Sequence, residues 1–530
     1  MTSTKVPLMF RAQIQGRCQL QYPPSNDAQT WAYEWVVKAS DQVPRFGVGV
    51  KTRPYTFNWR FVTNSGQDEG VIRPVIGARG WPFYPGASMK GAFRRVCPPE
   101  LVKCYCGDDE KLSPGILRFH GGYPVDNRWT DRKRLVDVVH PQESWQIRHE
   151  SHHSASAQIS LYQPTLAFGI SSNTVLSEEK WAEIWNVWER ALGLGLGSRV
   201  SAGYGQLKVK HENALLTVNL KGQGPASMLV NKSPEFRPNM FKAALRGHTL
   251  RLLGGLTDAG NAETITKELW GGFAERNGAI VGKLGIAFDA RNLELDRHGN
   301  NQLPVYELEQ GTLSILAMKS LEDLERQQLA GVTGLLVRFT MLLGGFGKSW
   351  RRVDHRLFFN SYATQPRNPM IGCHWEFNSV SRNLYYPVNE LAEVTSYLKK
   401  IRGAFRSWLK SKDVPIIPEG SNWCEAWHPD HVQVWGRLAP NGESQAVKWF
   451  HGPYQGAQTI KGSALAGKMG QIGRIWHRMY PRTTTNASGV IQGPNGYVEL
   501  LTIFPDDSSS TRAFLEFLQT RSEFEKVWPL

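Results

Sequence analysis

The chain has no run of about 18 consecutive apolar residues, the length that a helix needs to cross a bilayer. Its first residues, MTSTKVPLMFRAQIQ, lack the apolar core and the small-residue cleavage site of a secretory signal. Six cysteines among 530 residues do not suggest a disulfide framework. These absences argue against a membrane-spanning or disulfide-stapled secreted protein, and we expect a cytoplasmic protein with no membrane partner.

Acidic residues are outnumbered. The chain has 47 Asp and Glu against 62 Lys and Arg, which gives a formal net charge of +15. The basic residues are spread along the chain and interleaved with 19 Trp, 16 Tyr and 23 Phe. Because cations bind phosphates and aromatic rings stack on bases, this mixture favours single-stranded nucleic acid over duplex as the partner.

The common nucleotide and zinc-protease signatures are missing as well. No HExxH segment is present, and the only approach to a Walker A loop has Leu342 where the first glycine is required. The glycine-rich segment that starts at Gly193 follows a predicted helix and leads into a strand, which is not the order of a dinucleotide-binding fingerprint.

An internal repeat organises the chain. KGAFR begins at Lys90 and KAALR at Lys242, and each is followed by a glycine-rich segment: GLGSRVSAGYGQLKV from Gly195 and GGFGKSWRRVDHRLF with its GFG at Gly345. The separation is 105 residues in the first copy and 103 in the second. Two motifs in the same order at nearly equal spacing predict two tandem modules.

Each module is expected to be an α+β unit. Alternating stretches such as LMFRAQIQGRCQLQY and ALLTVNLKGQG predict strands, and LSEEKWAEIWNVWERALG predicts a helix capped by Ser177 and ending at Gly193. The order strand, helix, strands, helix, strand predicts tandem ferredoxin-like domains, over 1–212 and 213–359. Only 69 residues follow the third basic motif at Lys461, so 360–530 is expected to complete or decorate module two.

The opening stretch of the first repeat, PGASMKGAFRR, is a candidate phosphate holder. Ser88 is placed to cap a helix whose N–H groups favour an anion, and Lys90 and Arg94 share one face. A solvated basic helix is the alternative. The glycine-rich segments permit close backbone approach. The candidate RNA-binding residues are Ser88, Lys90, Arg94, Arg95, Arg199, Tyr204, Lys242, Arg246, Lys348, Arg351, Lys461 and Lys468.

PGASMKGAFR followed by GLGSRVSAGYGQL resembles the RAMP superfamily, the repeat-associated proteins of CRISPR systems, and in particular the backbone subunits of type III effector complexes. The resemblance covers 1–210 and extends to 213–358, where PNMFKAALR replaces PGASMKGAFR. Two fused modules are similar to the multi-domain subunits of type III-D-like complexes. The resemblance implies RRM-like domains, a subunit that wraps guide RNA (crRNA) and contacts paired target RNA, and other CRISPR effector subunits as partners.

The resemblance also implies that some modules cut target RNA with a loop aspartate and Mg²⁺ or another divalent ion. Family members place that aspartate just before a proline, but here Arg73 precedes Pro74. The candidate catalytic acids in module one are Asp27, Asp68 and Glu69. In module two the only acid between 214 and 241 is Glu235, so we expect that module to hold RNA without cutting it.

Two further groups and two rival functions stay open. Cys97, Cys104, Cys106 and His120 are candidate ligands of a structural Zn²⁺ ion, against the alternative of ordinary buried thiols. His149, His152 and His153 could act in a metal-independent endoribonuclease that processes guide precursor RNA, or could contact RNA or solvent. The other rival is a purely architectural RNA-binding subunit.

Overall fold

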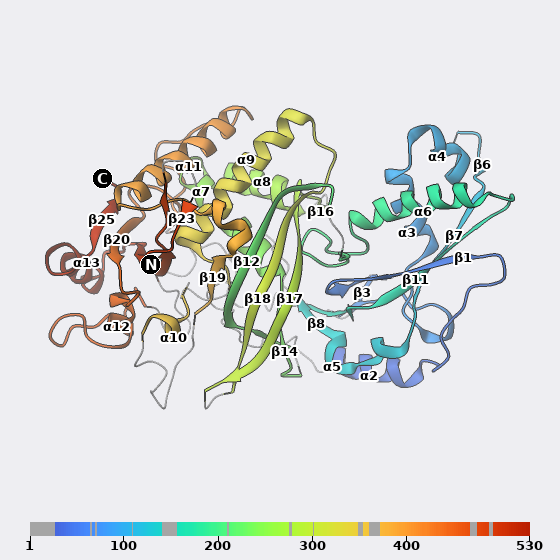
Figure 1. The fold of residues 1–530 in the computed structure, drawn as a ribbon, viewed down its shortest axis with the longest axis horizontal. Helices are drawn as coiled ribbons and strands as arrows, with labels where there is room; N and C mark the ends of the chain where they lie inside the picture. The colour runs from blue at the N-terminus through green and yellow to red at the C-terminus, as the bar shows by residue number, and fades with distance from the viewer. Residues whose placement is uncertain are drawn as a thin grey trace.

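The computed structural model describes residues 27–63, 66–68, 71–108, 110–139, 156–208, 211–229, 231–274, 278–299, 302–347, 353–359, 372–423, 425–466, 474–486 and 491–530. The fold is α+β. Figure 1 shows three assemblies of strands and helices along the long axis of the molecule, which we call the N-terminal, central and C-terminal lobes. Within the described residues, no helix is both long and apolar enough to cross a bilayer.

The N-terminal lobe is built around an antiparallel sheet. Its strands are β1 (Lys51–Thr56), β11 (Thr165–Ser172) and β7 (Leu117–Pro124), in that spatial order. Helix α3 (Gly86–Val96) leads from β1 towards β7 and packs on β7 and on α6 (Glu178–Gly193). The predicted first strand, LMFRAQIQGRCQLQY, lies outside the described residues.

Helix α6 confirms the prediction made from its spacing. Trp181, Ile184, Trp185 and Trp188 recur at the helical repeat and are all buried. The Ser177 hydroxyl accepts a hydrogen bond from the backbone N–H of Lys180, which satisfies one of the free donors of the first turn. The helix is held against the N-terminal lobe by a broad aromatic face.

A smaller mixed sheet lies beside this one. It contains β3 (Gly66–Asp68), β4 (Val71–Arg73), β9 (Ser156–Ile159) and β8 (Val136–Val139), in that order. Helices α2 (Asp27–Lys38) and α5 (Arg132–Leu135) pack against it and against each other. The loop position expected for the candidate acid Asp68 therefore belongs to a second sheet.

The central lobe has one four-stranded antiparallel sheet with the spatial order β17-β18-β12-β19. Along the chain it runs strand, helices, strand, strand, helix, strand. The elements are β12 (Ala214–Pro225), α7 (Asn239–Gly254), α8 (Ala259–Trp270), β17 (Leu284–His298), β18 (Leu303–Ala317), α9 (Asp323–Phe339) and β19 (His374–Phe377). The strand predicted from ALLTVNLKGQG is confirmed as β12, and β19 extends this sheet beyond residue 359.

The C-terminal lobe repeats the same plan in a sheet of its own, with the spatial order β21-β24-β20-β25. Its elements are β20 (Gln433–Ala439), α12 (Gln445–His451), β21 (Ile475–Pro481), β24 (Tyr497–Ile503), α13 (Ser509–Arg521) and β25 (Glu525–Trp528). The prediction from the 69 residues after Lys461 missed this sheet, because its first strand, β20, and its first helix, α12, lie before Lys461. Helix α11 (Ala392–Lys410) links the central and C-terminal lobes.

The remaining described elements are short. They are β2 (Arg60–Phe61), η2 (Ala78–Gly80), α4 (Pro99–Cys106), β5 (Gly107–Asp108), β6 (Ser113–Pro114), η3 (Asn127–Thr130), β10 (Leu161–Tyr162), β13 (Ser227–Met228), β14 (Pro234–Glu235), β15 (Gly272–Ala274), β16 (Gly278–Ile280), the π-helical η5 (Thr340–Gly344), α10 (His355–Phe358), η7 (Ser379–Leu384), β22 (Thr484–Thr485) and β23 (Ile491–Gln492).

The central and C-terminal lobes share one hydrophobic core. Leu336 of α9, Leu398 of α11 and Trp476 of β21 belong to the same buried cluster, whereas the N-terminal lobe has a separate cluster that includes Phe93 and Trp188. The N-terminal lobe must therefore be held to the central lobe by contacts other than a continuous apolar core.

A buried ionic cluster provides those contacts. Arg60 of the N-terminal lobe donates two hydrogen bonds to the Glu235 carboxylate of the central lobe, at 2.9 and 2.5 Å. Asp137 of the N-terminal lobe pairs with Arg237 of the central lobe at 2.5 Å, and the Tyr204 hydroxyl donates to Asp137 at 2.6 Å. Each carboxylate has a guanidinium partner from the other lobe, so the two lobes are fixed in one relative orientation.

Candidate nucleic-acid interface

A cleft of about 820 Å³ opens where the N-terminal and central lobes meet. Helix α3 lines it from the N-terminal lobe, and the start of α7 lines it from the central lobe. The glycine-rich segment 194–202 passes between these helices, and residues 270–272 and 279–281 complete the lining. The two repeat helices therefore face one shared cleft instead of two separate ones.

Helix α3 turns a specific face to the cleft. Ser88, Gly91, Ala92 and Arg95 line it, and their spacing of three and four residues places them on one side of a helix. Met89 and Phe93 are buried on a second face. Since each residue advances the helix by about 100°, the basic pair of the KGAFR motif lies on a third face, away from the cleft.

The prediction that Ser88 caps helix α3 is wrong. The helix begins at Gly86, its N-cap is Pro85 with no side-chain hydrogen bond, and Ser88 lies within the first turn. A β-carbon at Gly86 would lie 2.1 Å from the Phe119 carbonyl oxygen, so glycine lets the helix start directly against β7. Ser88 lines the cleft, and it does not cap the helix.

The glycine-rich segment is clamped between the two lobes. The Ile286 amide of β17 donates to the Ser201 carbonyl, and Leu196 donates to the carbonyl of Gly205. Gly197 and Gly205 have φ values of +79° and +61°, and a β-carbon at Gly205 would lie 1.8 Å from the Leu196 carbonyl oxygen. Glycine is therefore needed for this tight path along the cleft.

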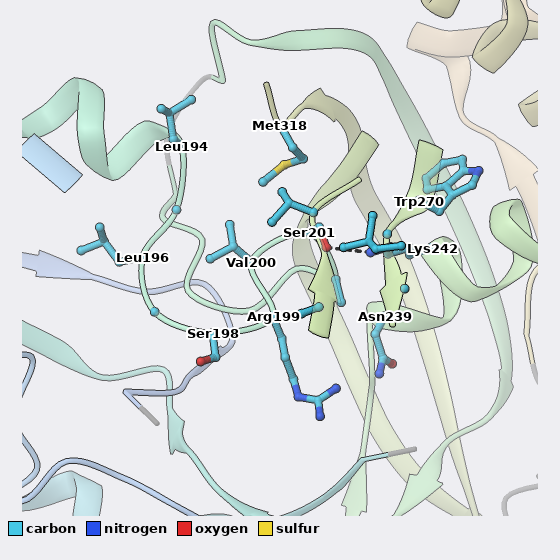
Figure 2. A pocket seen from close by; sticks show the side chains of 18 of the residues that line it. Leu194, Leu196, Ser198, Arg199, Val200, Ser201, Asn239, Lys242, Trp270 and Met318 are labelled. Carbon is cyan, nitrogen blue, oxygen red and sulfur yellow. Dashed lines mark hydrogen bonds between the residues drawn. The ribbon is translucent and has the colours of Figure 1, made fainter. Parts of the chain in front are cut away.

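Arg199 extends from this segment into the cleft, as Figure 2 shows. Its backbone has a left-handed φ of +59°, uncommon for a residue with a side chain. Its Nε donates to Gln158 Oε1 at 2.9 Å, and Gln158 Nε2 in turn donates to Asp137 at 3.3 Å. The buried ionic cluster thus positions this guanidinium group.

Lys242 and Arg246 reach the cleft from α7. Lys242 Nζ donates to the Ser201 hydroxyl at 2.7 Å, the contact drawn as a dashed line in Figure 2. Burial, together with the positive charges of Arg246 and Arg199, lowers the Lys242 pKa to about 7. Burial also lowers the Arg246 pKa to about 10, although Glu263 partly opposes this. The protein holds these cations close together against their mutual repulsion.

The charge of the cleft is positive. Arg95, Arg199, Lys242 and Arg246 line it, and none of the described lining residues is an aspartate or glutamate. Asn239, the first residue of α7, also lines it, so the positive end of that helix dipole lies at the cleft. Exposed glycine backbone, hydroxyl groups and converging cations together suit a sugar–phosphate chain.

Several predicted residues lie in this cleft and others do not. Ser88, Arg95, Arg199, Lys242 and Arg246 line it. Exposed Lys90 and half-buried Arg94 lie on the other face of α3, and exposed Lys461 lies in a turn of the C-terminal lobe. Lys348, Arg351 and Lys468 are outside the described residues, as are Glu69 and His149, His152 and His153.

Tyr204, a candidate RNA-binding residue, does not line the cleft. It is 1% exposed, its hydroxyl group donates to Asp137, and it accepts a hydrogen bond from Arg237 at 3.0 Å. Burial and the nearby Asp137 carboxylate raise its pKa above the ordinary value. The tyrosine is a member of the ionic cluster behind the cleft.

Sequence reasoning missed Gln158, Ser201, Asn239 and Trp270 as lining residues. Ser201 falls within the quoted glycine-rich segment and Asn239 within PNMFKAALR, whereas Gln158 and Trp270 lie in no quoted motif. These residues come from four separate segments of the chain, and only the tertiary fold places them around one cleft.

The candidate acids are placed differently. Asp68 ends β3, and the next strand, β4, contributes Ile72 to the lining of the cleft. Asp27 is the first residue of α2, which packs on α5 and β9 and contributes no residue to that lining. Of the two chain positions, Asp68 lies on the hairpin that borders the cleft.

The four candidate zinc ligands do not come together. Among the described residues, no three His, Cys, Asp or Glu side chains form a group able to hold a metal ion. In α4 the side chain of Cys104 is exposed whereas Cys106, two positions on, is buried, since residues two apart point to different sides of a helix. His120 Nε2 lies 2.7 Å from Ser171 Oγ, and Cys97 is buried with a raised pKa. The alternative of ordinary thiols fits this arrangement.

No protein-family model and no curated protein sequence matches the chain. Among solved structures it is similar to apo Cmr1 from Pyrococcus furiosus, with 12% identity and a TM-score of 0.33 over 59% of this chain and 98% of that one. Cmr6 from Pyrococcus furiosus matches with 13% identity and a TM-score of 0.21, over 30% of this chain and 96% of that one.

A chain of the type III-B Cmr-beta complex bound to cognate target RNA is also similar, with 18% identity and a TM-score of 0.25. The match covers 30% of this chain and 57% of that one, so a little over half of that relative's length is represented.

Proposed function

We propose that this chain is a RAMP-type subunit of a type III CRISPR ribonucleoprotein and that its cleft binds the backbone of guide RNA. The observation that carries the proposal is the convergence of four cations with a glycine-rich segment that lines the same cleft, without a described acid in the lining. Phosphodiesters carry the complementary charge at each nucleotide. The repeated basic helices and the motif resemblance make RNA the favoured polyanion.

The modular organisation supports the same proposal. In the central and C-terminal lobes, strand, helix, strand, strand, helix, strand form sheets of identical spatial order, the plan of a ferredoxin-like domain. Such domains are the usual framework of RNA-recognition modules. Target RNA and other CRISPR effector subunits are the remaining partners that we propose.

Target cleavage is a further element of the proposal. If module one cuts, the Asp68 position at the end of β3 is the favoured source of the carboxylate, because the next strand, β4, borders the cleft where the RNA would lie. Mg²⁺ held there would stabilise the charge that develops on the phosphate. A purely architectural subunit is the alternative, and it differs only in binding target RNA without cutting it.

The binding proposal is tested with the full chain and a fluorescent single-stranded RNA. Arg199→Gln and Arg246→Gln each remove a cation from the cleft. Lys90→Gln is the control, because it removes a cation of the KGAFR motif on a face of α3 that lies away from the cleft. The first two are expected to weaken binding and to reduce the slope of log K against log salt by about 0.7 for each lost phosphate contact. Equal losses in all three variants would contradict the assignment of the cleft.

A further inference from the structure

A second hollow lies on the N-terminal lobe, away from the cleft. Its volume is about 380 Å³, and it shares no lining residue with the cleft. Helix α2 contributes one wall and α5 contributes another. The lining residues are Gln29, Thr30, Ala32, Tyr33, Arg132, Lys133, Val136 and Asn231. We call this the Tyr33 hollow.

An exposed aromatic ring borders this hollow. Ala28, Ala32 and Trp35 of α2 are buried, whereas Tyr33 is 52% exposed. The guanidinium carbon of Arg132 lies 4.3 Å from the centre of the Tyr33 ring. The guanidinium group therefore lies over the face of the ring, and both kinds of group stack on nucleobases.

The surroundings of the ring are basic. Arg132, Lys133 and Arg134 are consecutive and exposed. Among the residues that the structure describes, neither Arg132 nor Lys133 forms an ion pair with a carboxylate, and Arg134 lies 3.8 Å from Asp131. Arg134 also lies over the ring of Tyr162 at 4.2 Å. Aromatic rings and cations thus alternate along this edge.

We propose that the Tyr33 hollow binds one unpaired nucleotide of a single-stranded RNA. The base stacks on the Tyr33–Arg132 surface over the apolar side chains of Ala32 and Val136. Lys133 and Arg134 contact the flanking phosphates. The proposal rests on the proposed function in taking RNA as the ligand, but it depends on none of the residues that line the cleft.

An acidic peptide is disfavoured by the same features. A carboxylate would use the cations but would leave the exposed ring and the apolar floor without a partner. A nucleotide uses all three, because it joins a flat apolar base to an anion. The polar side chains of Gln29 and Thr30 also line the hollow and can hydrogen-bond to the edge of a base.

The test uses the full chain and a short oligouridine in which a single 2-aminopurine reports stacking by its fluorescence. Tyr33→Phe keeps the ring, whereas Tyr33→Leu removes it at similar volume. We expect Tyr33→Phe to bind like the wild type and Tyr33→Leu to lose roughly 5- to 100-fold in affinity, the range for one base–aromatic stack. Val37→Leu on exposed α2 surface is the matched control.

A second oligomer, with abasic sugars in place of the bases, separates stacking from charge. The difference between Tyr33→Phe and Tyr33→Leu should vanish with this oligomer. Equal affinity of the two variants for oligouridine would overturn the proposal. So would a competition experiment in which polyglutamate displaces the RNA from the wild type and from Tyr33→Leu equally well.

The failure of this proposal is distinguishable from that of the proposed function. If Arg199→Gln binds RNA normally while Tyr33→Leu does not, the cleft is wrong and the hollow stands. If Arg199→Gln loses binding and the Tyr33 variants do not, the hollow is wrong and the cleft stands.

Discussion

The lysine at the centre of the cleft gives the most direct physical test. Lys242→Met removes its charge while keeping most of its length, and Lys242→Arg keeps a charge that does not titrate below about pH 12. In the wild type, burial and the charges of Arg246 and Arg199 lower the Lys242 pKa from 10.5 to about 7. The protonation state of this group therefore changes within the range where binding is easily measured.

The magnitude follows from that pKa. Lowering it from 10.5 to about 7 disfavours the charged form by on the order of 5 kcal/mol. A bound phosphate lies against the charged form, so it raises the pKa and makes binding take up a proton. Between about pH 7 and pH 9 the affinity of the wild type for RNA should then fall by up to about tenfold per pH unit.

The assay is fluorescence anisotropy with single-stranded RNA at constant ionic strength from about pH 6 to pH 9. Lys242→Met should bind more weakly at the acid end and show a flatter dependence on pH. Lys242→Arg should retain affinity at the alkaline end. Lys90→Met, on the other face of α3, should follow the wild type. Parallel pH profiles for the wild type and Lys242→Met would refute the reasoning.

Stability offers an independent check with a defined sign. Between about pH 7 and pH 10.5 the unfolded chain binds a proton on Lys242 that the folded chain has lost, so this group makes the free energy of unfolding rise with pH. Below about pH 7 both states are protonated and the destabilisation is complete. The melting temperature of Lys242→Met minus that of the wild type should therefore be largest near the acid end of this range and decline as the pH rises.

Two further predictions concern the junction and the chemistry. Glu235→Gln leaves Arg60 buried without its carboxylate, so chemical denaturation should show a free energy of unfolding lower by roughly 3–5 kcal/mol. The double variant Arg60→Met, Glu235→Leu should recover some of this stability. An unchanged free energy of unfolding in Glu235→Gln would contradict the role of the ionic cluster. In the assembled complex with end-labelled target RNA and Mg²⁺, Asp68→Ala should abolish one EDTA-sensitive product while Asp27→Ala leaves it; cleavage unchanged in both would make the chain architectural.

Local patterns predict local structure well in this chain. The spacing of Trp181, Ile184, Trp185 and Trp188 predicts α6, and Ser177 marks its start, because both signals act within a few residues. The alternation in ALLTVNLKGQG predicts β12 for the same reason. The order of the repeated motifs also predicts that basic helices recur.

Contacts between distant segments were not accessible in the same way. The glycines around Tyr204 in the sequence give no sign that its ring is buried. Asp137, 67 residues earlier, and Arg237, 33 residues later, hydrogen-bond to its hydroxyl group in the folded chain. The quoted stretch PGASMKGAFRR contains both Lys90 and Arg95. The packing of α3 on β7 decides which of them faces the cleft: Arg95 does and Lys90 does not. In both cases the deciding partner is set by the tertiary fold.

The same tertiary fold explains why two repeats make one site. If each module built a separate site from its own helix and its own glycine-rich segment, the cations of α3 and α7 would lie in separate places. Instead the segment from the N-terminal lobe hydrogen-bonds to β17 of the central lobe, and Arg60–Glu235 and Asp137–Arg237 fix the angle between the lobes. The Phe346 ring of the second glycine-rich segment is buried, and the described residues of that segment do not line the cleft. Fusion of the modules is therefore integral to the binding site, because neither lobe alone brings Arg95 and Arg199 opposite Lys242 and Arg246.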